Sequence, residues 1–270
     1  MFERHGKTTM VSTPRIEDVN ALAIELADMA QDLSLRYFRK PIDVDHKQDD
    51  SPVTVADREI ETAMRVHIQK TFPDHGLFGE EHGKENPDAE CLWILDPIDG
   101  TKSFITGMPL FATLIAYVEH SKPVLGIVGF PGLGERWVGM AGHPTRFNGE
   151  VCKVSACTSL AEANIYTTSP DFFDEPGLVL YEKISRRARM RRYGGDSYPQ
   201  GLLASGHVDA VMEMSLKPYD YMAVVPVVEG AGGVMTDWQG QPLDENSDGR
   251  VLSAATPELH QEILSLINSN

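Results

Sequence analysis

In the N-terminal quarter of the chain, apolar residues recur at intervals of three and four, the period of an amphipathic helix. One such stretch covers residues 16–38 and stops before Pro41, a residue that ends helices. A second covers residues 55–71, with Ile60, Met64 and Ile68 along one stripe. The pattern predicts two helices that each bury one face. Residues 1–12 are polar and are expected to form a flexible tail.

Beyond residue 90 the pattern changes to short apolar runs, which are typical of strands. Strands are predicted over residues 92–95, 113–118, 124–130 and 136–140, with a turn at 120–122 that joins an antiparallel pair. Glycine and proline between 131 and 149 indicate loops and a seam between two halves.

After residue 150 strands and helices alternate. Strands are predicted over 164–168, 190–193 and 210–214, and helices over 177–188, 199–205, from 219, and 257–267. The expected organisation is therefore an N-terminal α+β half (13–150) and a C-terminal α/β half (151–270). Together they indicate a layered sandwich of sheets and helices, of class α+β or α/β.

Composition narrows the set of partners. The 270 residues carry 24 basic and 40 acidic side chains, a formal net charge of −16. Such a surface repels nucleic acid and anionic membranes and suits cations. The longest apolar run, near 110–118, is about half of the ~18 residues that span a bilayer. Three cysteines and a polar start indicate a cytoplasmic protein with free thiols.

The segment Trp93–Thr101 carries the strongest chemical signal. An apolar strand ends in Asp96, Asp99 follows three residues later, and Gly100 and Thr101 come next. Two carboxylates at a strand end suit Mg²⁺. A helix that opens at Gly100 would point free N–H groups at an anion. The alternative is a strand-to-turn junction with two solvated aspartates.

Three further carboxylates remain ambiguous from the sequence alone. Glu80 follows a short apolar strand and is either a ligand or a surface residue. Asp57 follows Thr54 at the spacing of a capping box, and alternatively orients a catalytic hydroxyl. Asp220 stands at a predicted helix start, where a carboxylate is a cap or a ligand.

The sequence also excludes several mechanisms. Neither the phospho-aspartate pattern D-x-D-x-T, nor a cysteine with arginine six residues later, nor G-x-S-x-G occurs. Residues 230–233 do not complete a dinucleotide fingerprint. A protein nucleophile is therefore not expected.

In this order the four acidic segments resemble the inositol monophosphatase superfamily, whose members are metal-dependent, lithium-sensitive phosphatases with an αβαβα sandwich. The resemblance covers the chain from about Ile16 onward. Segments 167–170, 192–198 and 216–221 are most similar to the histidinol-phosphate phosphatase branch. Tyr219 replaces the tryptophan of the inositol-type members, which favours that branch.

The resemblance implies roles for individual residues. Two or three Mg²⁺ would be held by Glu80, Asp96, the carbonyl of Ile98, Asp99 and Asp220. Asp57 and Thr101 would pair, and Thr101 and Glu80 would orient and deprotonate the attacking water. Phosphate would be held by Gly100, Thr101, Gly194 and Gly195. The alcohol portion of the substrate would be contacted by Asp196, Glu213 and Arg192.

The expected activity is Mg²⁺-dependent hydrolysis of L-histidinol phosphate to L-histidinol and phosphate, in histidine biosynthesis. Asp196 and Glu213 suit a cationic aminoalcohol, although Asp196 alternatively caps the helix that follows it. The alternatives are an inositol monophosphatase or another small phosphate-ester phosphatase, and a non-catalytic binding protein of RNA-handling machinery. A homodimer is expected from the resemblance. The arginines of segment 186–192 either pair with the acid excess or bring Arg192 to the site or to a dimer interface.

Overall fold

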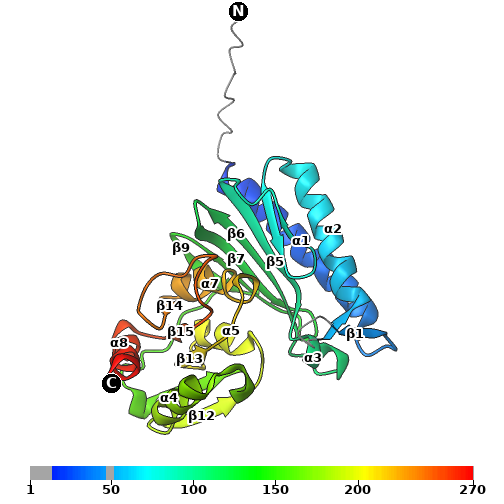
Figure 1. The fold of residues 1–270 in the computed structure, drawn as a ribbon. Coiled ribbons are helices and arrows are strands. Elements are labelled where there is room, and N and C mark those ends of the chain that lie inside the picture. The colour runs from blue at the N-terminus through cyan, green and yellow to red at the C-terminus, as the bar shows by residue number, and fades with distance from the viewer. Residues whose placement is uncertain (1–13, 47–51, 270) are drawn as a thin grey trace, which may run out of the picture.

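The computed structural model describes residues 14–46 and 52–269, so the expected tail at 1–12 lies outside the described residues. Two large sheets dominate the fold, one in each half of the sequence (Figure 1). A separate two-stranded ribbon pairs β1 (Val44–His46) with β2 (Pro52–Thr54).

The first large sheet has eight strands in the order β10-β9-β8-β7-β6-β5-β3-β4. Their bounds are β3 (Gly76–Gly79), β4 (Gly83–Glu85), β5 (Cys91–Asp99), β6 (Ala112–Glu119), β7 (Lys122–Phe130), β8 (Glu135–Met140), β9 (His143–Phe147) and β10 (Glu150–Val151). The strands pair antiparallel except β3 with β5. The prediction of loops up to residue 149 was wrong for β9, which forms a hairpin with β8 around Gly142.

Two long helices, α1 (Ile16–Tyr37) and α2 (Val55–Thr71), cover one face of this sheet (Figure 1). Their apolar stripes are buried together with inward-facing residues of β5, β6 and β7. Both helices match the predicted stretches, because the 3.6-residue period reports directly on the buried face.

The second large sheet has five strands in the order β12-β11-β13-β15-β14. Their bounds are β11 (Asn164–Thr167), β12 (Met190–Tyr193), β13 (Ala210–Glu213), β14 (Val234–Asp237) and β15 (Val251–Ala254). The last two were not predicted. They lie in a stretch rich in glycine and polar residues, where four-residue strands leave little periodicity.

The other helices follow β5 or belong to the second half of the sequence. Their bounds are α3 (Thr101–Ile105), which follows β5, and then α4 (Glu175–Ser185), α5 (Tyr198–Ala204), α6 (Pro218–Tyr221), α7 (Val224–Gly230) and α8 (Pro257–Asn268). The helix expected from residue 219 is therefore two short helices. Two 3₁₀ turns, η1 (Leu160–Glu162) and η2 (Pro170–Phe172), flank β11.

The layers follow from three apolar cores. The first lies between α1, α2 and the large sheet, the second between that sheet and α5–α7, and the third between the small sheet, α4 and α8. The αβαβα sandwich is thus confirmed. The three cysteines are free, and no helix in the described ranges is long and apolar enough to cross a bilayer.

Candidate active site

The end of β5 brings two aspartates to the same side of the sheet. In a regular strand, residues three apart point to opposite faces. The ladder between β5 and β6 shifts register between Asp96 and Asp99, which adds one residue to β5 and reverses that relation. The two carboxylates can therefore face one space, as predicted for two carboxylates at a strand end.

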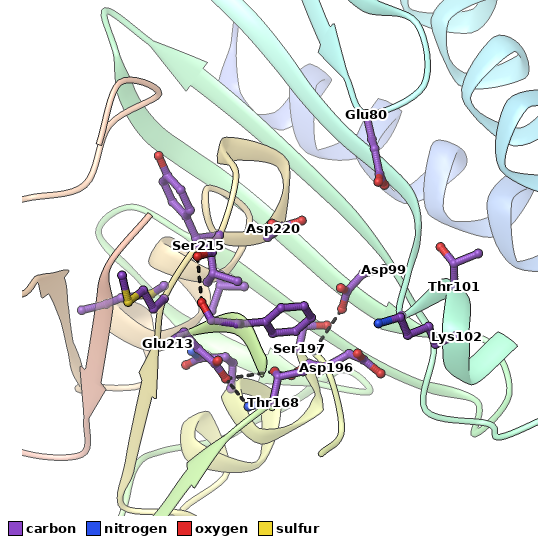
Figure 2. Close-up of a pocket in the computed structure, with 18 residues that line it drawn as sticks. Glu80, Asp99, Thr101, Lys102, Thr168, Asp196, Ser197, Glu213, Ser215 and Asp220 are labelled. Atoms are coloured by element: carbon purple, nitrogen blue, oxygen red, sulfur yellow. Dashed lines mark hydrogen bonds between the residues drawn. The ribbon is translucent and has the colours of Figure 1, made fainter. Parts of the chain in front are cut away.

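Asp220 completes this cluster from the other half of the sequence. It stands in α6, and Oδ2 accepts the N–H of Lys217 at 2.6 Å, so the residue caps its helix and also faces the site. Carboxylate oxygens of Asp96, Asp99 and Asp220 all lie within 4.8 Å of one another. Glu80, in the turn after β3, points toward the same space (Figure 2).

The cluster is electrostatically strained without a counter-ion. Burial and the neighbouring Glu80 and Asp99 raise the pKa of Asp96 well above its ordinary value. Burial and Asp99 do the same to the pKa of Asp220. Burial and Asp196 raise the pKa of Asp99 to about 7, although Oδ2 accepts the N–H of Ser197 at 2.9 Å. Clustered buried carboxylates are the donor set that a hard divalent cation requires, so the residues present fit Mg²⁺.

Asp57 forms the capping box at the start of α2. Its Oδ2 accepts the backbone N–H and the hydroxyl of Thr54, at 2.8 and 2.6 Å. The Thr101 hydroxyl donates to the carbonyl of Ile98 at 3.2 Å, so the expected Asp57–Thr101 pair is wrong for this structure. Among the described residues, Oδ1 of Asp57 is buried without a hydrogen-bond partner.

The structure agrees only in part with the expected phosphate-binding residues. Gly100 lines the cavity at the start of α3 with φ 81°, and a Cβ there would lie 2.7 Å from Oδ2 of Asp196, so only glycine fits. The N–H of Gly194 donates to the carbonyls of Thr167 and Thr168, at 3.0 and 2.9 Å. That donor is already used within the chain, so this structure gives no support to the expected contact of Gly194 with phosphate. The residues that line the cavity do not include Gly195.

The far end of the cavity holds a second kind of carboxylate. Glu213, 3% exposed on β13, accepts the hydroxyl of Thr167 and both the N–H and the hydroxyl of Thr168, at 2.8–3.0 Å. Burial nevertheless raises the pKa of Glu213 to about 8. The carboxylate is fixed in place and changes protonation near neutral pH.

Asp196 connects the two halves of the molecule. It adopts a left-handed backbone with φ 48°, and Oδ2 accepts the hydroxyl of Ser103 in α3 at 2.8 Å. Ser197 is the N-cap residue of α5 and no side chain caps this helix, so the alternative that Asp196 caps it was wrong. Its carboxylate lines the same cavity as Glu213 (Figure 2).

Arg192 does not reach this cavity. It lies exposed on β12, at the edge of the small sheet, and is not among the residues that line the site. Nearby, Arg186 and Arg191 both pair with Glu182, at 2.7 and 2.8 Å, as expected for arginines in an acidic chain. The expected contact of Arg192 with the substrate was therefore wrong within one chain.

The cavity of about 220 Å³ also contains residues that the sequence did not single out. Lys102 follows the Gly100-Thr101 pair and places its Nζ 5.8 Å from the ring centroid of Phe172. A cation directly after a candidate phosphate loop was a readable signal. Phe172 belongs to η2, and no motif marks it.

Comparison with known proteins agrees with this geometry. The model of the inositol monophosphatase family matches residues 15–270. The chain is 44% identical over 264 residues to the bifunctional phosphatase IMPL2, chloroplastic, of Arabidopsis thaliana, covering 94% of this chain and 76% of that protein. It is 36% identical over 250 residues to the histidinol-phosphatase of Chlorobaculum parvum, covering 92% and 96% of the two chains.

A solved structure is similar over nearly the whole fold. It is described as an inositol monophosphatase from Zymomonas mobilis, is 48% identical in sequence, and superposes with a TM-score of 0.87. The match covers 95% of this chain and 100% of that one. With the family model matched across both sheets and the carboxylate cluster at their junction, the chain belongs to the inositol monophosphatase family.

Proposed function

We propose that this chain is a Mg²⁺-dependent phosphomonoesterase that hydrolyses L-histidinol phosphate. The observation that carries the proposal is one cavity that contains both a cluster of repelling aspartates and a separate, hydrogen-bonded glutamate. At one end Asp99 and Asp220 line the cavity, with the buried Asp96 directly behind them in the same cluster. Toward the other end lies Glu213, and Asp196 lies between Glu213 and Asp99, close enough to affect the pKa of each.

The metal end supplies the chemistry of hydrolysis. Glu80, Asp96, Asp99, Asp220 and the carbonyl of Ile98 would hold the ions. Bound there, two or three Mg²⁺ would lower the pKa of a water molecule and balance the charge of the leaving alkoxide. The anionic cluster offers phosphate no favourable contact of its own, so the enzyme should depend strictly on the cation.

The chain's own residues then prepare the attacking water and the phosphate. The Thr101 hydroxyl donates to Ile98, so its oxygen lone pairs are free to accept a hydrogen bond from the water. Glu80 accepts the water's proton. The first N–H groups of α3 have no acceptor within the helix and contact the phosphate oxygens, next to the ammonium of Lys102.

The alcohol end selects the substrate. A cation beside Asp196 and Glu213 favours their ionised forms and offsets the burial that raises both pKa values. An aminoalcohol with an ammonium group meets this requirement, and a neutral polyol does not. The sequence identity to the histidinol-phosphatase of Chlorobaculum parvum supports the same choice of substrate.

Inositol monophosphate is the second candidate substrate, because the similar Zymomonas mobilis structure is described as an inositol monophosphatase. Phosphate release should be measured with histidinol phosphate, inositol 1-phosphate and fructose 1,6-bisphosphate, each with Mg²⁺ and with EDTA. We expect the highest kcat/KM for histidinol phosphate, and no phosphate release from any substrate in EDTA. A higher kcat/KM for inositol 1-phosphate would reverse the order of the two candidates.

We also infer that the chain acts as a homodimer, on the resemblance to its superfamily. Exposed Arg192 on the edge strand β12 would then be available to a second copy. Sedimentation velocity at micromolar concentration should show a species of twice the chain's mass. A single species of one chain would refute the dimer.

A further inference from the structure

Three consecutive backbone N–H groups in the turn that carries Glu80 donate hydrogen bonds to acceptors outside the turn. The N–H of Glu80 donates to the carbonyl of Leu95 on β5, at 3.2 Å. The N–H groups of Glu81 and His82 donate to the two carboxylate oxygens of Glu61, at 2.7 and 3.2 Å. The position of Glu80 therefore depends on a side chain that lies outside the cavity.

Glu61 is suited to such a role by its place in α2. It follows Asp57 by four residues, so both carboxylates lie on the same face of the helix. The side chain of Glu61 is fully buried. Arg65, one turn later, donates Nε to Oε1 of Glu61 at 2.7 Å and bonds the carbonyl of Gly83 through Nη2. The Glu61–Arg65 pair thus forms hydrogen bonds with the N–H groups of Glu81 and His82 and with the carbonyl of Gly83.

Gly79 shows how closely the turn is seated on this carboxylate. A Cβ at position 79 would lie 2.0 Å from Oε1 of Glu61 and 2.6 Å from Oε2. A real Cβ cannot approach so closely, so any other residue there would push the turn away from α2. The backbone immediately before Glu80 therefore has no room to move toward α2.

We propose that Glu61 is a positioning residue that sets the carboxylate of Glu80 against the aspartate cluster. The inference rests on the proposed function, in which Glu80 is a metal ligand. Both oxygens of Glu61 accept N–H groups, so the side chain must be a carboxylate. Glutamine would turn its own NH₂ toward one of those donors and release that side of the turn.

The test compares Glu61→Gln with Glu59→Gln, which changes an exposed glutamate on the outer face of the same helix. Calorimetric titration of each metal-free protein with Mg²⁺ gives the affinity without reference to catalysis. Loss of a group that orients a metal ligand weakens binding roughly 10- to 100-fold, which is the result expected for Glu61→Gln. Glu59→Gln should bind as the unchanged protein does. The Mg²⁺ concentration for half-maximal phosphate release should rise by the same factor.

A double variant separates positioning from general support of the fold. In a Glu80→Gln background, adding Glu61→Gln should weaken Mg²⁺ binding no further, because the two residues act through one ligand. An equal loss in both backgrounds would overturn the proposal. So would an unchanged Mg²⁺ affinity with a lowered melting temperature. If Glu61→Gln does not fold, Glu61→Asp, which keeps the charge but shortens the reach, should show the same dependence on Glu80.

The two proposals fail in distinguishable ways. A wild-type protein that binds Mg²⁺ but releases no phosphate from any ester would refute the proposed function, and the calorimetric comparison would still decide the role of Glu61. A wild-type protein that does not bind Mg²⁺ would overturn both.

Discussion

The two ends of the cavity both bury carboxylates, yet they stabilise them by different means. Glu213 accepts two hydroxyls and an N–H from Thr167 and Thr168. Asp96 accepts the N–H of Ile98 and faces other carboxylates. The fold itself supplies the donors at the alcohol end. At the end with the aspartate cluster it crowds like charges, whose repulsion a proton or a bound cation relieves. Burial and hydrogen bonds alone therefore do not distinguish a candidate metal ligand from a candidate substrate contact, since the clustered aspartates also accept N–H groups; the crowding of like charges does.

The largest expected effect comes from neutralising the metal end. Asp96→Asn should lower kcat at least about 100-fold, because a buried cation that loses one charged partner is destabilised by on the order of 3 kcal/mol. The same change should raise the melting temperature of the metal-free protein, since it removes repulsion. Steady-state kinetics and thermal unfolding check the two parts. Asp88→Asn, an exposed aspartate, is the control, and an Asp96→Asn variant with normal kcat would contradict the assignment.

The next effect concerns the alcohol end. A charge-assisted hydrogen bond contributes roughly 1.5–3 kcal/mol, or roughly 10- to 150-fold in kcat/KM. Asp196→Ala and Glu213→Gln should each lose that much on histidinol phosphate and far less on p-nitrophenyl phosphate. Ser103→Ala is the matched control, because it removes the hydrogen bond to Asp196 but keeps the carboxylate. Equal losses on both substrates would show that Asp196 acts only by joining the two halves.

A third effect is the pH dependence of stability. The pKa values of Asp96, Asp99 and Asp220 are higher in the folded chain than their ordinary value of 3.8, and that of Glu213 is higher than 4.5. The folded state therefore holds more protons, and stability falls as pH rises. In EDTA the melting temperature should decline from about pH 4 through the pKa values of about 7 and about 8 of Asp99 and Glu213.

Saturating Mg²⁺ should flatten this decline, because the cation favours the ionised carboxylates. Melting curves at a series of pH values, with and without Mg²⁺, measure both slopes. A metal-free protein that gains stability between pH 5 and 8 would show that the cluster is not under repulsion.

The smallest effect tests the donors around Glu213. Thr167→Val keeps the shape of a fully buried side chain and removes its hydrogen bond to Oε2. The free energy of unfolding should fall by about 1 kcal/mol. Urea unfolding measures this change. No loss of stability would mean that the hydroxyl does not support the carboxylate.

The sequence predicted best those features that depend on a periodic pattern or on a short segment. The helices α1 and α2 and the central strands follow from their apolar periods. The D-x-x-D segment predicted two carboxylates at the strand end, although it is the register shift in β5 that brings Asp96 and Asp99 to one face. The four-residue strands β14 and β15 were missed, since so few residues give no readable period.

Contacts between distant segments were harder to predict. Gly194 looked available for phosphate, but its N–H donates to the carbonyls of Thr167, the last residue of β11, and of Thr168, which follows it. The hydroxyl of Thr101 found a carbonyl three residues away, and Asp57 found Thr54 in its own capping box. Polar side chains often form hydrogen bonds with groups nearby in the sequence, which leaves them unavailable to distant partners. A motif does not show whether such a nearby bond forms.

The register shift in β5 has a consequence for how this site tolerates sequence change. Pro97 and Ile98 have no partner in the ladder with β6, and their carbonyls accept the hydroxyls of Thr113 and Thr101 instead. A carbonyl released from a sheet in this way can serve as a main-chain ligand, and no substitution of the side chain at position 98 removes it. The site is therefore robust to point mutation at that residue and fragile to a change of length. A one-residue deletion between the two aspartates would restore a regular ladder and return that carbonyl to the sheet.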